Sequence, residues 1–202
     1  MNFVLEVLAG DRLVAHLGHD AMADAWSLTY TREWLDDPHA FPLLPPLPLS
    51  PSGQGYDSRS IKRFIEHLLP EGHALDVAIA ANGLAKSNVF GLIRALGTET
   101  AGVLRFRDAQ ADMHAPAGPE MREIPIAELD HRIADRDMPF TVWDGKVRMS
   151  VAGVQDKLLV YLDAPLAQGG RLFLVEGPRL ASTHILKPDL GHFRPPHLAV
   201  NE

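Results

Sequence analysis

Two short segments in the last third of the chain carry the residue types needed to bind a triphosphate. Residues 149–157 read Met-Ser-Val-Ala-Gly-Val-Gln-Asp-Lys, a run of small residues that ends at Lys157. Residues 182–188 read Ser-Thr-His-Ile-Leu-Lys-Pro, a β-prone run that carries Lys187. Small residues let backbone N–H groups approach phosphate oxygens closely, and a strand lysine offsets their charge. The order of the two segments therefore predicts an ATP site.

Each segment by itself has a simpler explanation. A small-residue turn before a strand is usually part of a hairpin, and the G-x-G-x-x-G pattern of ordinary protein kinases is absent. A lysine at a strand end is usually solvated. A buried strand lysine, however, costs free energy unless an anion pairs with it. Only the combination of the two segments favours phosphate binding.

Residues 150–157 and 182–187 together resemble the signature of HipA-type toxin kinases. These are serine/threonine protein kinases of bacterial toxin–antitoxin pairs, with a fold distantly like that of phosphoinositide 3-kinases. Further segments resemble the N-terminal subdomain of that family, so the resemblance spans the whole chain. They are residues 30–35, Phe41–Leu49, residues 64–72 and residues 97–104.

The resemblance also implies roles for individual residues. Ser150 takes the place of a serine that family members autophosphorylate, and a phosphate there would repel the ATP phosphates. Lys187 would pair with the α and β phosphates, and Glu202 is a candidate ion-pair partner for Lys187. Val154 and Asp156 depart modestly from the family pattern. The residues expected to bind ATP are Val151, Ala152, Gly153, Val154, Gln155, Lys157 and Lys187.

Catalytic residues of a kinase are not found in this sequence. His131-Arg132-Ile133-Ala134-Asp135 resembles H-R-D only superficially, because two extra residues intervene and it precedes the phosphate loop. Asp189-Leu190-Gly191 lies too close to Lys187 to act as D-F-G. The ten histidines lack metal-ligand spacing. We therefore expect the catalytic and metal-binding residues outside this chain, which by itself would be inactive as a fragment or as one half of a split kinase.

For the intact protein, the resemblance implies transfer of the ATP γ-phosphate, with Mg²⁺, to a protein hydroxyl, leading to growth arrest. Family substrates are translation components such as aminoacyl-tRNA synthetases, and the implied partner is a HipB-like helix-turn-helix antitoxin. One alternative is a non-catalytic binding or inhibitory module of a split HipA-type system. Another is an unrelated scaffold that does not bind ATP. The phosphate loop and Lys187 favour the kinase, because an inhibitor would not need them.

The composition is that of a cytoplasmic protein and agrees with this hypothesis. The 202 residues are 46% hydrophobic and carry a net charge of −7, which disfavours direct nucleic-acid binding. Cysteine is absent, so disulfides and thiolate chemistry are excluded. The N-terminus lacks the pattern of a signal peptide, and no apolar run is long enough to span a membrane.

Hydrophobic periodicity predicts that the N-terminal part of the chain is a mixed α+β subdomain. Phe3–Leu8 and Arg12–Leu17 flank a turn at Gly10, and residues 26–31 alternate as a third strand. The six prolines of residues 38–52 predict extended coil. Apolar residues at helical spacing predict helices at residues 61–69, 74–81, 86–96 and 126–134, and a strand is expected at residues 101–106.

Four β-prone runs then predict the antiparallel sheet of a nucleotide-binding lobe: residues 147–151, 157–162, 171–175 and 184–187. The predicted fold class is α+β. We expect a HipA-type N-terminal subdomain at residues 1–137 and the start of a kinase lobe at residues 138–202.

Overall fold

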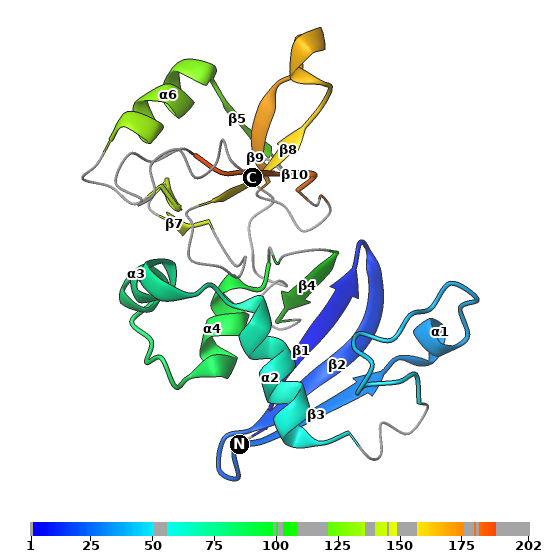
Figure 1. Ribbon diagram of the computed structural model, residues 1–202. Helices are drawn as coiled ribbons and strands as arrows, with labels where there is room; N and C mark the ends of the chain where they lie inside the picture. The colour runs from blue at the N-terminus through cyan, green and yellow to red at the C-terminus, as the bar shows by residue number, and fades with distance from the viewer. Residues whose placement is uncertain are drawn as a thin grey trace.

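In the part of the chain that it describes, the computed structural model contains two four-stranded antiparallel sheets and one two-stranded sheet, and helices pack against both larger sheets (Figure 1). The residues that it describes are 2–50, 56–98, 100, 103–108, 121–135, 140–144, 146–148, 157–175, 180 and 182–188. The fold is mixed α+β, as the sequence predicted. Within the described residues, no helix has the length and apolar character to cross a membrane.

The first sheet has the strand order β3-β2-β1-β4. Strands β1 (Asn2–Ala9) and β2 (Arg12–Asp20) form the predicted hairpin, with Gly10 at a φ of 61° in its turn. Strand β3 (Ala25–Tyr30) extends the sheet beside β2, and β4 (Leu104–Arg107) pairs with the other edge of β1. The positive φ explains glycine at the turn, because other residues adopt this conformation with strain.

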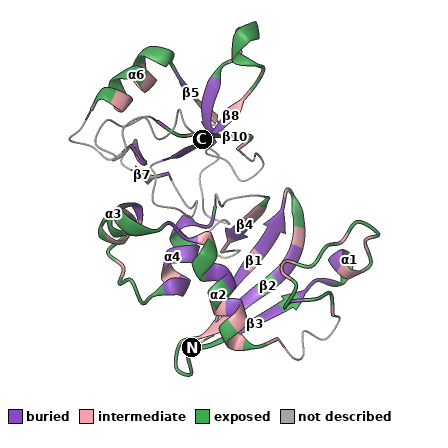
Figure 2. Ribbon diagram, in the orientation of Figure 1, coloured by how far each residue is buried: buried purple, intermediate pink, exposed green. Residues whose placement is uncertain are grey.

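Helices α2 (Ser58–Leu68) and α4 (Val89–Leu96) pack on this sheet and enclose the larger core. In α2 the predicted apolar stripe is buried through Ile61, Phe64 and Ile65, and Asp57 caps the helix by accepting a hydrogen bond from the Ser60 N–H at 3.0 Å. Helix α3 (Gly72–Asn82) ends at Gly83, which has a φ of 61°. The buried residues of α2 and α4 thus face the buried residues of the first sheet (Figure 2).

The proline-rich segment packs as an extended arm against this core. Helix α1 (Arg32–Leu35) precedes it, and the indole N–H of Trp34 donates to the Phe41 carbonyl at 3.2 Å. The Tyr30 hydroxyl donates to the Leu47 carbonyl at 2.6 Å and accepts from the Leu43 N–H at 2.9 Å. Leu47 is fully buried, so the arm belongs to the core although the described part of it has no helix or regular strand.

The second sheet has the order β10-β8-β9-β5. Its strands are β5 (Met121–Ile124), β8 (Leu158–Leu162), β9 (Leu172–Val175) and β10 (His184–Leu186). Helix α6 (Ile126–Ala134) and a hairpin of β6 (Val142–Trp143) and β7 (Lys146–Val147) complete this unit. A short 3₁₀ turn, Leu166–Gln168, joins β8 to β9 and ends at Gly169. Antiparallel pairing of the last three predicted runs is confirmed.

Strand β5 and helix α6 share a core with the predicted kinase lobe, although both precede residue 138. Ile124 is buried with Trp143, Leu158 and Leu172, and Leu129 of α6 packs against this cluster. The core of the second sheet therefore includes residues from the N-terminal side of the predicted 137/138 boundary. The division into residues 1–137 and 138–202 stays a prediction.

Candidate functional site

The register of β8 and β10 brings the two predicted phosphate-binding lysines to neighbouring positions. Ile185 pairs with Leu159, and Leu186 pairs with Leu158. Lys157 and Lys187 each lie one residue beyond this antiparallel ladder, next to the paired residues Leu158 and Leu186. Side chains directly opposite each other in such a pair lie about 4.5–5.5 Å apart at Cβ. The two lysines, thirty residues apart in the sequence, are thus at adjacent strand ends.

Both lysines belong to the sheet face that is turned away from the small core. Leu158, Val160 and Leu186 pack into or against that core. Because successive side chains of a strand alternate between faces, Lys157 and Leu159 share the opposite face with Ile185 and Lys187. Lys157 is only 6% exposed, whereas Lys187 is exposed.

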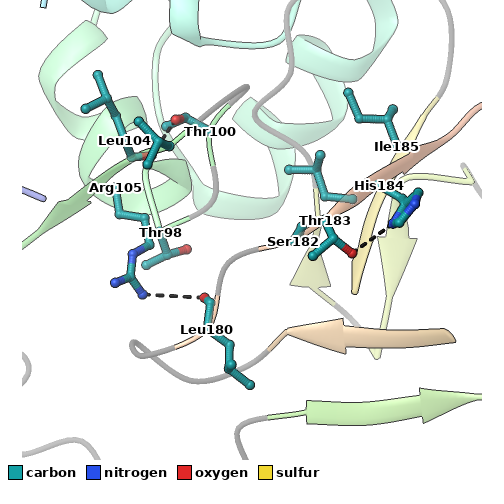
Figure 3. Close-up of a pocket in the computed structure, with 11 residues that line it drawn as sticks. Thr98, Thr100, Leu104, Arg105, Leu180, Ser182, Thr183, His184 and Ile185 are labelled. Atoms are coloured by element: carbon teal, nitrogen blue, oxygen red, sulfur yellow. Dashed lines mark hydrogen bonds between the residues drawn. The ribbon is translucent and has the colours of Figure 1, made fainter. Parts of the chain in front are cut away.

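A cavity of about 420 Å³ lies along this face, between the second sheet and the end of the first. Its wall on β8 and β10 includes Leu159 and Ile185, which are two residues away from Lys157 and Lys187 along their strands. Figure 3 shows the other wall, formed by Thr98, Thr100, Leu104 and Arg105, across from the segment Ser182–Ile185. The lining combines apolar side chains with hydroxyl groups and the Arg105 guanidinium, whereas Lys157 and Lys187 lie next to the cavity along their strands and do not line it. Such a mixed surface suits a ligand with both apolar and polar parts.

Arg105 links the two units at this cavity and was missed by the sequence analysis. It is 8% exposed, and its Nη1 donates to the Leu180 carbonyl at 3.5 Å (Figure 3). Its Nη2 donates to the Gly10 carbonyl and lies 3.4 Å from Asp11 Oδ1. The Nε is buried without a hydrogen-bond partner among the described residues. In the sequence, Arg105 alternates with Leu104 and Phe106, and this local pattern does not predict its contacts with the distant Gly10 and Leu180.

The predicted phosphate loop lies between two described anchors. Ser150, Val151, Ala152, Gly153, Val154, Gln155 and Glu202 lie outside the described residues. Before the loop, the Arg148 backbone N–H donates to the Thr141 carbonyl at 2.8 Å, and its Nη1 donates to the Val175 carbonyl at 3.2 Å. After the loop, Lys157 leads directly into β8.

Acidic and histidine side chains of the described residues are the groups that a metal site and the H-R-D-like sequence would need. Within those residues, no three histidine, aspartate or glutamate side chains are grouped so as to hold a metal ion. The Asp135 carboxylate, which follows the H-R-D-like sequence, is engaged by Arg132 Nη1 at 3.2 Å.

Comparison with known proteins shows the class to which this chain belongs. A sequence model of the HipA N-terminal domain matches residues 5–107, just over half of the chain, and the chain belongs to this family. The serine/threonine-protein kinase toxin HipA of Shewanella oneidensis is 39% identical over 202 residues, which are all of this chain and 42% of that protein. A second relative, Y4mE of Sinorhizobium fredii, is 32% identical over 195 residues, which are 94% of this chain and 44% of that protein.

A solved structure extends the similarity to three dimensions. The complex of HipA, HipB and operator DNA from Shewanella oneidensis MR-1 contains a chain that matches 90% of this one with a TM-score of 0.68 and 39% identity. The match covers 39% of that chain. The present chain therefore spans less than half the length of these relatives.

Proposed function

We propose that this chain forms the ATP-binding N-terminal part of a HipA-type serine/threonine protein kinase toxin. The observation that carries the proposal is the antiparallel pairing of β8 with β10, which brings Lys157 and Lys187 to neighbouring strand ends, two residues away from Leu159 and Ile185 in the cavity wall. Lys157 and Lys187 stand at the positions where the resemblance to HipA-type kinases implies phosphate contacts, and their ammonium groups are suited to phosphate oxygens. Backbone N–H groups of residues 151–155 would complete the triphosphate site.

In this proposal, each part of the nucleotide has its own surroundings. Lys157 and Lys187 hold phosphate oxygens, and Leu159 and Ile185 offer apolar contacts two residues further along the strands. Mg²⁺ would offset the remaining phosphate charge, and its ligands and the catalytic aspartate would come from residues outside this chain. The intact protein would transfer the γ-phosphate to a serine or threonine hydroxyl of a translation component such as an aminoacyl-tRNA synthetase.

The proposed partner is a HipB-like antitoxin, because the similar HipA of Shewanella oneidensis was solved with HipB and operator DNA. A net charge of −7 on this chain makes its own surface unfavourable for DNA. The antitoxin would therefore make the DNA contacts. Phosphorylation of Ser150 would add negative charge next to the proposed phosphate site and weaken ATP binding.

Titration of Mg·ATP into the purified chain, followed by calorimetry, tests the nucleotide site. Lys157→Ala and Lys187→Ala should each weaken binding at least about ten-fold, the effect of losing one charge-assisted hydrogen bond to phosphate. Lys86→Ala is the matched control, since Lys86 is exposed and lies in the first unit. Equal affinity of all four proteins would remove the basis of the proposal.

The reaction itself is tested in the longer protein that contains this sequence. Lys187→Ala should abolish incorporation of labelled phosphate while thermal unfolding stays unchanged, because the exposed side chain contributes little to packing. The 202-residue chain alone should show no kinase turnover. If the wild-type chain binds no ATP and the longer protein transfers no phosphate, the non-catalytic module of a split system becomes the better explanation.

A further inference from the structure

The two sheet units meet at a small apolar contact and at a cavity. Among the described residues, the buried apolar cluster that spans both units consists of Ala74 on α3 and Leu159 on β8. The cavity of about 420 Å³ lies beside Leu159, and its walls come from both units. Apolar contacts have no preferred direction, and side chains do not fill a cavity. These two features therefore do not fix the angle between the units.

Arg105 on β4 adds directional contacts to both units in this region. Its Nη2 donates to the carbonyl of Gly10 in the turn between β1 and β2. Its Nη1 donates to the Leu180 carbonyl at 3.5 Å (Figure 3). Shortly after Leu180, the Thr183 N–H donates to the Val160 carbonyl of β8 at 2.9 Å. Because a guanidinium is planar, two carbonyls held by its N–H groups are fixed in direction as well as in distance.

The same arginine is a poor choice for stability at this place. Arg105 is 8% exposed, and its Nε is buried without a hydrogen-bond partner among the described residues. The carboxylate that contacts it belongs to Asp11, lies 3.4 Å from Nη2 and has a side chain that is 75% exposed. A buried charge with so little compensation costs free energy, and the N–H without a partner adds to that cost.

We propose that Arg105 is an orientation latch, which fixes the angle at which the second sheet unit meets the first without stabilising the fold. Contacts between units of one chain commonly allow relative motion unless they are large and hydrophobic. A buried polar group can select one arrangement among several of similar free energy, at some cost in stability.

The latch joins the β1–β2 turn to the segment that leads into β10. It thereby sets where the face of β8 and β10 that carries Leu159 and Ile185 lies relative to the first unit. The latch acts independently of what the cavity binds.

Two variants remove the latch in different ways. Arg105→Met keeps a long unbranched side chain but removes the charge and every N–H donor. Arg105→Lys keeps the charge, but its single ammonium does not present two N–H groups across a planar fork. The control is Arg94→Met, which removes an arginine of the first unit whose Nη2 lies 2.6 Å from Asp108 Oδ2 in the same unit.

The distance between two spin labels, measured by electron paramagnetic resonance, reports the angle between the units. The chain has no cysteine, so two introduced cysteines can be labelled without background. Lys86→Cys in the first unit and Gln168→Cys in the second replace exposed residues. With this label pair, the distance distribution should be narrow in the otherwise unchanged chain and in the control. It should be broader in both Arg105 variants. Equal widths in all four proteins, or a control as broad as the Arg105 variants, would overturn the latch.

Urea unfolding of the same proteins separates orientation from stability. Arg105→Met should unfold at the same or a higher urea concentration than the chain with Arg105, because the cost of burying the charge disappears. The two carbonyls released belong to Gly10 and Leu180, which are half-buried and can be rehydrated. A lower urea midpoint for Arg105→Met, with or without a broader distance distribution, would show that Arg105 is an ordinary stabilising contact and would also refute the proposal.

Discussion

Tyr30 provides the sharpest test of how the proline-rich arm contributes to the first unit. The residue is 3% exposed at the end of β3, and its hydroxyl bonds two backbone groups of the arm, at Leu47 and Leu43. Burial raises the pKa of Tyr30 above its usual value, so the hydroxyl stays protonated and able to donate throughout the neutral range. Tyr30→Phe removes both hydrogen bonds and almost no apolar contact.

The expected loss follows from the surroundings of the two backbone groups. Leu47 is fully buried, so its carbonyl would be left without water, at a cost of about 2 kcal/mol. Leu43 is half-buried, and its N–H can be partly rehydrated, which reduces its cost to about 1 kcal/mol. We therefore expect Tyr30→Phe to lower the free energy of unfolding by about 3 kcal/mol, a large part of the stability of a small domain.

Urea unfolding followed by tryptophan fluorescence measures this effect, because Trp26 and Trp34 both belong to the core of the first unit. Tyr161→Phe is the matched control. Tyr161 is half-buried beside Phe173 in the second sheet, and its loss should change the unfolding free energy by less than about 0.5 kcal/mol. If Tyr30→Phe were as mild as this control, the arm would not be held by the tyrosine hydroxyl.

Local patterns in the sequence were sufficient to predict the helices and hairpins whose partners are close in the chain. The hairpin around Gly10 and the stripe of α2 were predicted because turn chemistry and helical periodicity both act over a few residues. The ends of predicted helices differ from the observed ends by a few residues. The helix predicted from residue 86 begins at Val89, because Asn88 accepts a hydrogen bond from the Gly91 N–H and acts as the N-cap.

Elements that depend on distant partners escaped prediction. Strand β5 has the sequence Met-Arg-Glu-Ile, which is half charged and does not predict a strand. It forms a strand because it pairs with β9, which is distant in the sequence. Arg122 and Arg105 were missed for the same reason, since their partners lie far away in the sequence. Lys157 and Lys187 were selected from the sequence, but their cross-strand relation follows from the register of β8 and β10. Their role in ATP binding stays a prediction.

Two further predictions concern the first unit. The hydrogen bond from Lys62 is the largest cause that lowers the pKa of Asp24 to about 2 from an ordinary value of 3.8. The stabilising contribution of Asp24 should therefore be present above pH 4 and be lost as the pH falls through 2, and Asp24→Asn should flatten the dependence of the unfolding free energy on pH in that window. Gly97→Ala should destabilise the chain by about 1–3 kcal/mol in urea unfolding, because a Cβ there would lie 2.7 Å from the Phe106 Cβ and also meet the Ile93 carbonyl, where α4 meets β4. Wild-type stability of this variant would mean that α4 and β4 can separate at no cost, contrary to the tight 2.6 Å hydrogen bond from the Phe106 N–H to the Gly97 carbonyl.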